Sequence, residues 1–206
     1  MKEVDDIKAI RALMERSSKF LSLSGLSGVV AGAVALLGAA FAYFYLLRDP
    51  SATDFNRYQE MLILLADAVV VLVLAVGFGI FFSWRKARRS GEKLSRKIAL
   101  KTLYNLAIPL VAGGIFCLML LYRGDLRMAI AGTLVFYGLA LVNASKFTLE
   151  EIHYLGITEI ALGLAAAFSS RYGIIFWSLG FGICHIVYGL IMYFKYDRKR
   201  DDQPDI

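Results

Sequence analysis

The sequence of 206 residues is poor in charged side chains, in histidine and in cysteine. Charged residues make up 19% of the chain, hydrophobic residues make up 58%, and the mean hydropathy is +0.61. A soluble domain of this length needs much less apolar surface to fill its core. The shortage of charge therefore excludes an ordinary soluble globular protein, and we expect the surplus apolar surface to face lipid.

Histidine and cysteine are scarce, with two residues of each. Cys117 and Cys184 both fall within apolar segments, without a C-x-x-C motif and without a histidine at metal-ligand spacing. We expect both to be small buried thiols in the reduced state. The pattern argues against a structural metal site and a disulfide framework, and no cofactor is predicted.

Long apolar segments dominate the rest of the chain. Each has about the 17 to 25 residues that cross a hydrocarbon core as a helix. None alternates with the two-residue period of a barrel strand, and lipid offers the backbone no hydrogen-bond partners. The segments are residues 20–47, 61–84, 102–122, 128–145, 152–170 and 172–194. We predict an all-α polytopic membrane protein with a six-transmembrane-helix bundle. Three helical hairpins would form this bundle.

Charged segments at the two ends divide the chain into three parts. Residues 1–19 are expected to form a cytoplasmic amphipathic N-terminal segment, because apolar residues recur there at three- and four-residue spacing. Residues 20–196 form the six-helix transmembrane domain, and residues 197–206 form a charged cytoplasmic tail. The apolar core of a cleaved signal peptide has about 7 to 15 residues. The first apolar segment is longer, so we expect it to remain in the protein as a helix.

Lysine and arginine are distributed unevenly about the predicted helices. Of the 23 lysine and arginine residues, only five lie on the side of the membrane opposite to the two termini. These are Arg48, Arg57, Arg123, Arg127 and Arg171. Because positively charged flanks are held on the cytoplasmic side, both termini are predicted to be cytoplasmic. This asymmetry also accounts for the isoelectric point of about 9.3 without a nucleic-acid partner.

A basic cluster directly follows the second predicted helix and consists of Arg85, Lys86, Arg88 and Arg89. Its simplest interpretation is a loop that fixes the orientation of the protein. Such residues can also contact anionic lipid headgroups, at about 1 kcal/mol for each residue near the surface. The lipid bilayer is therefore the first expected partner.

The first helix contains Gly25-Leu26-Ser27-Gly28, a tetrapeptide that rhomboid-type intramembrane serine proteases place around their nucleophile. A serine nucleophile needs a base within hydrogen-bond reach and donors for the oxyanion. The depths of Ser27 and His185 permit a meeting, but the remainder of the rhomboid pattern has no counterpart here. An intramembrane hydrolase is the remote alternative, and no catalytic residue is assigned.

Helix packing is the favoured interpretation of the same segment. Ser24, Gly28 and Gly32 share one stripe of small residues, and the two glycines form a G-x-x-x-G motif that lets backbones approach closely. We expect this face to contact another helix. Transmembrane helix 1 is accordingly the expected contact for a protein partner or a homo-oligomer.

Five polar residues lie inside the predicted helices, namely Asp67, Asn105, Asn143, Glu159 and His185. Each is unfavourable to insert and is expected to face the bundle interior or a watered cavity. Interhelical hydrogen bonding is the structural interpretation, and a solute or proton path is the alternative. Glu159 and His185 lie at similar depths on either side of the turn at Arg171, so we predict that they face each other and share a proton or hydrogen bond.

Ser22 to Gly28, Asn143-Ala144-Ser145-Lys146 and Tyr188-Gly189-Leu190 before Lys195 together resemble a group of small bacterial integral-membrane proteins of unassigned function. The resemblance spans nearly the whole chain and implies a location in the bacterial cytoplasmic (inner) membrane. The resemblance assigns no catalytic residue to this chain.

Two main classes of function follow from these features. The favoured one is a noncatalytic regulatory or assembly module, because the loops are short, the first helix carries a small-residue stripe and the N-terminal segment is amphipathic. The alternative is a small-solute or proton-coupled transporter that uses the intramembrane polar residues.

Overall fold

The computed structural model describes residues 23–46, 54–89 and 96–198, and all regular elements in these ranges are helical. The predicted all-α class is therefore confirmed for this part of the chain. Six helices here are long and apolar enough to cross a membrane: Gly25–Phe44, Gln59–Arg88, Arg96–Tyr122, Leu126–Ser145, Glu150–Phe168 and Gly173–Asp197. The predicted segment 1–19 and most of the tail lie outside the described residues.

The helices follow one another with few breaks. They are α2 (Gly25–Phe41), which continues as the π-helix η1 (Ala42–Leu46), α3 (Asp54–Arg89), α4 (Arg96–Tyr122), α5 (Leu126–Ser145) and α6 (Glu150–Phe168). After the 3₁₀ turn η2 (Ser170–Tyr172) come α7 (Gly173–Trp177), the π-helix η3 (Ser178–Cys184), α8 (His185–Met192) and the π-helix η4 (Tyr193–Asp197). We call Gly173–Asp197 the C-terminal helix.

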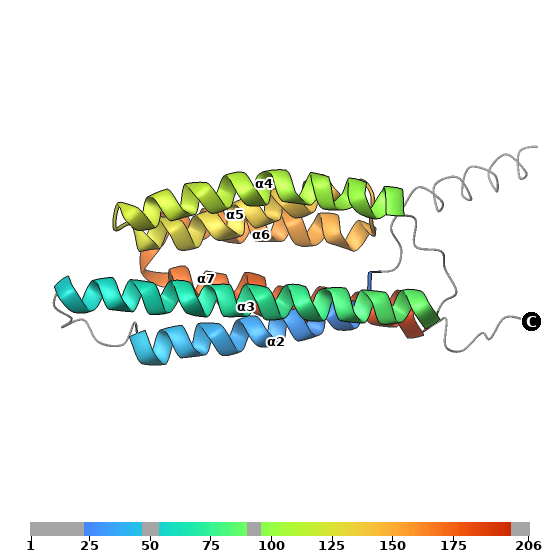
Figure 1. Ribbon diagram of the computed structural model, residues 1–206, viewed down its shortest axis with the longest axis horizontal. Coiled ribbons are helices and arrows are strands. Elements are labelled where there is room, and N and C mark those ends of the chain that lie inside the picture. The colour runs from blue at the N-terminus through green and yellow to red at the C-terminus, as the bar shows by residue number, and fades with distance from the viewer. Residues whose placement is uncertain (1–22, 47–53, 90–95, 199–206) are drawn as a thin grey trace, which may run out of the picture.

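The helices form two layers (Figure 1). One layer contains α4, α5 and α6, and the other contains α2, α3 and the C-terminal helix. Within the layers, α5 packs between α4 and α6, and α2 packs against both α3 and the C-terminal helix. The C-terminal helix also contacts α5 and α6, so it joins the two layers.

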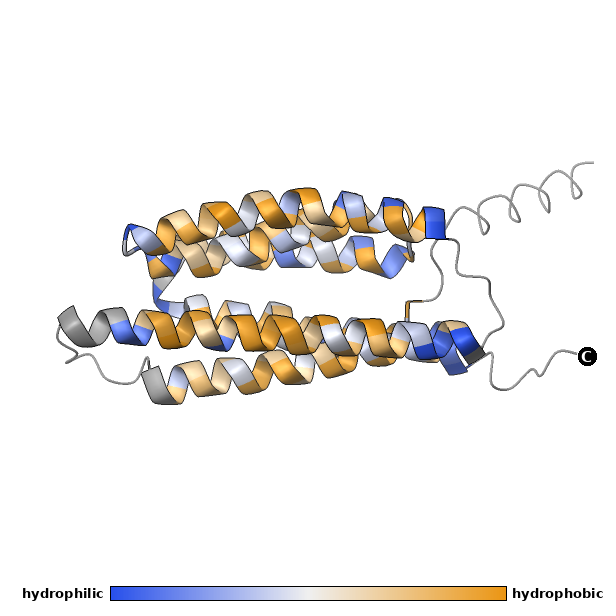
Figure 2. Ribbon diagram, viewed as in Figure 1, coloured by the Kyte–Doolittle hydropathy of each residue, from blue (hydrophilic) through white to orange (hydrophobic). Residues whose placement is uncertain are grey.

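Apolar side chains cover the outside of the bundle, most densely on α3 and α4. Val73 and Ile80 on α3, and Ile115 on α4, are among the many large apolar residues that are exposed. Hydrophilic residues gather toward the helix ends, as Figure 2 shows. We call the end that holds Lys86, Glu151 and Lys195 the basic end. Exposed apolar surface on this scale fits contact with lipid.

A tight turn fixes α4 and α5 as antiparallel neighbours. Gly124 has φ +79°, a conformation that glycine adopts without steric cost. Asp125 then caps α5, because its side chain accepts a hydrogen bond of 3.1 Å from the backbone N–H of Met128. The local sequence thus places the start of α5 beside the end of α4.

Glycines allow two pairs of helices to pack with their backbones in contact. A Cβ atom on Gly156 of α6 would lie 2.8 Å from the carbonyl oxygen of Gly138 on α5. A Cβ atom on Gly28 of α2 would lie 3.1 Å from the Cα atom of Gly189 on α8. Small residues permit this proximity. The bundle therefore contains two closely packed pairs, α5 with α6 and α2 with the C-terminal helix.

Candidate functional site

The structure brings Glu159 and His185 together where these two helix pairs meet. Glu159 lies in the middle of α6 and is 0% exposed, and His185 begins α8 and is 7% exposed. Nδ1 of His185 lies 3.3 Å from Oε1 of Glu159. A carboxyl group and an imidazole, both removed from solvent, therefore share one site inside the bundle.

Hydrogen bonds fix the orientation of the His185 ring. Nδ1 lies 3.0 Å from the carbonyl oxygen of Gly180, and Nε2 lies 2.8 Å from Oη of Tyr137 on α5. A carbonyl oxygen can only accept, so Nδ1 carries the hydrogen and donates it to Gly180. In the neutral ring, Nε2 then accepts the hydroxyl hydrogen of Tyr137.

The carboxylate of Glu159 is buried without a hydrogen-bond donor in the described part of the chain. Nδ1 of His185 is within ion-pair distance of it but directs its hydrogen to the carbonyl of Gly180. Gly180 makes room for the carboxylate, because a Cβ atom there would overlap Oε2 of Glu159. An unsatisfied buried carboxylate is unfavourable, which marks Glu159 as a candidate functional group.

Aromatic rings surround the imidazole. Phe181 stacks on His185 with a centroid distance of 5.9 Å and an interplanar angle of 20°. Tyr137 and Trp177 both pack against Phe181, at 4.9 Å and 4.8 Å between centroids. The cluster of Trp177, Phe181, Tyr137 and His185 therefore connects α5 to the C-terminal helix.

Apolar clusters lie on either side of the site along the bundle axis. The cluster toward the basic end contains Leu141, Leu149, Ile152, Leu155 and Met192, and we call it the basic-end cluster. The cluster toward the opposite end contains Ala131, Leu134 and Ala166. Glu159 lies between them on α6, so its carboxyl group is enclosed from both ends.

The remaining predicted polar residues lie elsewhere. Asn143 of α5 donates from Nδ2 to the carbonyl oxygen of Asn105 on α4 at 2.8 Å, and Asn105 donates to Lys101 of its own helix. Asp67 on α3 lies opposite Gly38 of α2, where a Cβ atom would be 3.4 Å from its Oδ2. Thus Asn105 and Asn143 link two helices, and Asp67 belongs to the contact between α2 and α3.

The small-residue stripe of α2 faces the C-terminal helix of the same chain. Gly28 and Gly32 lie against Gly189 and Ile186, respectively. Ser24 donates to a side-chain oxygen of Asp197 at 3.2 Å. The face on which a partner was expected is therefore occupied within the chain.

The hydroxyl of Ser27 donates to the carbonyl oxygen of Ser24 at 2.5 Å. The ring nitrogens of His185 are engaged by Tyr137 and Gly180 instead. The geometry thus assigns Ser27 a hydrogen bond within its own helix, as expected for a packing residue.

The basic cluster after the second helix is only partly free to meet lipid. Lys86 lies 2.7 Å from Oδ1 of Asp197 and donates to the carbonyl oxygen of Leu23 at 2.8 Å. The guanidinium of Arg88 lies 4.0 Å from the centroid of the Trp84 ring, and Arg85 is exposed. The side chain of Arg89 lies outside the described part. Lys86 thus forms an internal contact rather than a headgroup contact.

Metal binding finds no support within the ranges that the structure describes. No group of three or more histidine, cysteine, aspartate or glutamate residues is arranged there to hold an ion. Cys117 and Cys184 are free thiols. Cys117 is buried as predicted, whereas the prediction is wrong for Cys184, which is only partly buried because it lies on the C-terminal helix next to the exposed Ile183.

Sequence reasoning did not identify Tyr137, Gly180 or Phe181 as members of the site. All three residue types are ordinary for a membrane helix. Tyr137 reaches His185 only because α5 packs on the C-terminal helix, whereas Gly180 and Phe181 approach it along the π-helical part of its own helix. No protein-family model, curated protein or solved structure matches this chain. Its function must therefore be argued from the geometry of Glu159 and its neighbours.

Proposed function

We propose that this protein is a proton-coupled transporter of a small solute in the bacterial inner membrane, with both termini in the cytoplasm. The observation that carries the proposal is the carboxyl group of Glu159, which is 0% exposed and has no hydrogen-bond donor in the described part of the chain. Ionisable groups retained inside a membrane bundle are unfavourable for insertion and commonly serve ion or proton pathways.

The pair of Glu159 and His185 can hold one labile proton in two ways. With the proton on the carboxyl group, both partners are neutral and Nε2 of His185 accepts from Tyr137. With the proton on Nε2, the pair is an imidazolium and a carboxylate, and Tyr137 turns its hydroxyl to accept. An isolated charge is unfavourable in an apolar site, which favours a pair that is neutral overall. Release of the proton would therefore require water or a solute to enter.

Among the residues that the structure describes, few other titratable groups face this pair. Tyr137 faces it from α5, and Cys184 lies beside it on the C-terminal helix. Helix α2 has no titratable residue in Gly25–Phe41. The proton-linked step is thus assigned to Glu159 and His185, with Tyr137 as their hydrogen-bond partner.

The irregular C-terminal helix supports a role in transport. The π-helical segment Ser178–Cys184 includes Gly180, whose carbonyl oxygen accepts from His185. π-helical turns occur often at functional sites, and interrupted helices commonly form the substrate sites of transporters. The enclosed carboxyl group between two apolar clusters fits the occluded state of such a protein.

A pH jump applied to proteoliposomes on a solid-supported membrane tests the proposal. We expect a transient current from proton binding in the unmodified protein, and loss of this current in Glu159→Gln. Glu150→Gln is the matched control, because Glu150 is the exposed glutamate at the start of the same helix. An unchanged current in Glu159→Gln would refute the assigned role. Solutes added in turn should then produce a sustained current for the transported class.

A noncatalytic regulatory or assembly module is the second candidate function. The observation that favours it is the hydrogen bond between Asn143 and Asn105, which joins α5 to α4. Two of the five polar residues inside the helices therefore serve helix packing and not a transport path. A partner would meet a face of α2 other than the one carrying Gly28 and Gly32. This candidate predicts that Glu159→Gln changes stability while no proton current exists in any variant. No catalytic role is proposed for Ser27.

A further inference from the structure

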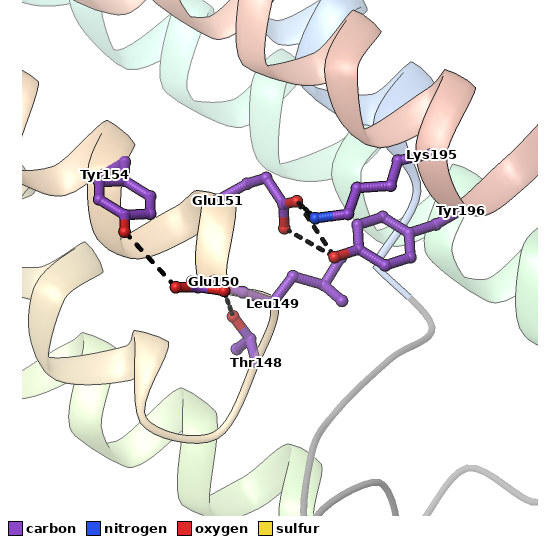
Figure 3. Close-up of polar contacts among 7 residues, drawn as sticks. All are labelled: Thr148, Leu149, Glu150, Glu151, Tyr154, Lys195 and Tyr196. Atoms are coloured by element: carbon purple, nitrogen blue, oxygen red, sulfur yellow. Dashed lines mark hydrogen bonds and ion pairs between the residues drawn. The ribbon is translucent and has the colours of Figure 1, made fainter.

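At the basic end, three consecutive residues of the C-terminal helix hold both layers of the bundle. Lys195 and Tyr196 bind α6, as the dashed lines in Figure 3 show, and Asp197 binds α2 and α3. The end of this one helix therefore closes the bundle on the side of the basic-end cluster.

The contacts to α6 converge on Glu151. Nζ of Lys195 donates to Oε1 of Glu151 at 2.6 Å, and the hydroxyl of Tyr196 lies 3.1 Å from each carboxylate oxygen. Glu151 is 7% exposed and lies in the first turn of α6, where the helix dipole favours a negative charge. The carboxylate thus keeps a favourable interaction even when Lys195 moves away.

The contacts to the other layer are more protected. Oδ1 of Asp197 lies 2.7 Å from Nζ of Lys86, and both side chains are 12% exposed. Oδ2 accepts from the backbone N–H of Gly25 at 3.0 Å, so Asp197 also caps the start of α2. Lys195, in contrast, is 52% exposed. Glu151 is enclosed, but Lys195 can exchange its partner for water at low cost, whereas both members of the other pair are enclosed, so the contact with α6 is the easier of the two to open.

The contact with α6 also lies beside the apolar cluster that separates the basic end from Glu159. Glu151 lies about two turns before Glu159 on the same helix. The intervening side chains of Ile152 and Leu155 belong to the basic-end cluster, against which Tyr196 and Cys184 also pack. Separation of Tyr196 from Glu151 would uncover this cluster, and behind it the carboxyl group.

We propose that Glu151, Lys195 and Tyr196 form a gate that controls the access of water from the basic end to the site of Glu159 and His185. Asp197 and Lys86 anchor the C-terminal helix to α2 and α3, and the gate opens when α6 moves away from Lys195 and Tyr196. This inference rests on the proposed transport function, for which it identifies the closed barrier on one side.

Cys184 is a natural reporter of the gate, because it lies beside His185 and packs on the basic-end cluster. In a Cys117→Ala background it is the remaining cysteine of the chain. A thiol reacts with maleimides as the thiolate, so labelling requires water at the sulfur. A membrane-impermeant maleimide, applied to oriented vesicles from each side separately, therefore measures access from each end.

Opening the gate should raise labelling of Cys184 from the basic end alone. For Glu151→Gln and for Lys195→Gln combined with Tyr196→Phe, we expect the rate to rise roughly fivefold or more, because the closed state loses charge-assisted hydrogen bonds. The charge swap Glu151→Lys with Lys195→Glu should bring the rate back toward that of the parent. Glu150→Gln should leave it unchanged.

Three results would refute the gate: unchanged labelling in Glu151→Gln, an equal rise from both sides, and an equal rise in Glu150→Gln. The assay needs no proton movement, so it separates this inference from the proposed transport function. A rise from the basic end without any pH-jump current would support the gate and reject proton coupling.

Discussion

The hydroxyl of Tyr137 lies 2.8 Å from Nε2 of His185, and this contact decides which ring nitrogen faces Glu159. Tyr137 holds one side of the imidazole, so Nδ1 is directed toward Gly180 and the carboxylate. A tyrosine on α5 thereby controls the geometry of a pair formed between α6 and the C-terminal helix. The phenol is a positioning group for the proposed proton site.

Removal of this hydroxyl should destabilise the protein. In Tyr137→Phe the nitrogen Nε2 loses its partner in a buried site, which is expected to cost about 1–3 kcal/mol of unfolding free energy. Equilibrium unfolding of the purified protein in detergent measures the loss. Tyr104→Phe is the control, because Tyr104 on α4 is 68% exposed. Equal stability of the two variants would show that the contact is unimportant.

Substitution of Gly28 by leucine should disrupt the packing of α2 on the C-terminal helix. A side chain there meets the backbone of Gly189, and overpacking typically costs about 1–3 kcal/mol. The accumulated level and the unfolding midpoint should both fall. Gly114→Leu is the matched control, since a Cβ atom on that glycine meets open space. Ser27→Ala should leave level and stability unchanged, and loss of function at normal abundance would revive the hydrolase alternative.

Lys86 and Asp197 should act as a coupled pair at the basic end. Asp197→Ala removes both the ion pair and the cap of α2, so we expect a loss of about 1–3 kcal/mol. Lys86→Ala should cost less, and the double variant should lose less than the sum of the single variants. Unfolding measurements on all four proteins give the coupling, and strict additivity would contradict the contact.

The predicted topology can be tested with reporter fusions. A reporter that works only in the cytoplasm should be active after Ile206 and within residues 85–97, because the lysines and arginines there favour the cytoplasmic side. It should be inactive within residues 52–58. A periplasmic signal from the C-terminal fusion would overturn the assignment of both termini.

The sequence was sufficient to predict the helical class and the meeting of Glu159 with His185. Apolar segment lengths determine how many helices can cross a bilayer, and distance from the turn at Arg171 determines depth along a helix. Both quantities can be counted along the chain. This is why the pair could be predicted without knowledge of the packing.

The other residues of the site could not be predicted from the sequence, because their contacts depend on how the helices pack. Tyr137 reaches His185 only through the packing of α5 on the C-terminal helix, and Gly180 matters because a π-helical segment brings its carbonyl and Cα atoms to the pair. The charges of Lys86 and Asp197 resemble ordinary flanking charges in the sequence. Their contact across two helix ends follows from the fold, so the sequence could not distinguish an anchor from a lipid contact.

Infrared difference spectroscopy of the reconstituted protein tests the central claim most directly. A protonated carboxyl group has a C=O stretching band that a carboxylate lacks, so a pH titration reports proton binding at Glu159. We predict a carboxylic-acid band that disappears as the pH rises, is missing in Glu159→Gln and is retained in Glu150→Gln. Identical pH-difference spectra of the unmodified protein and Glu159→Gln would contradict the account, because Glu159 would then neither bind nor release a proton.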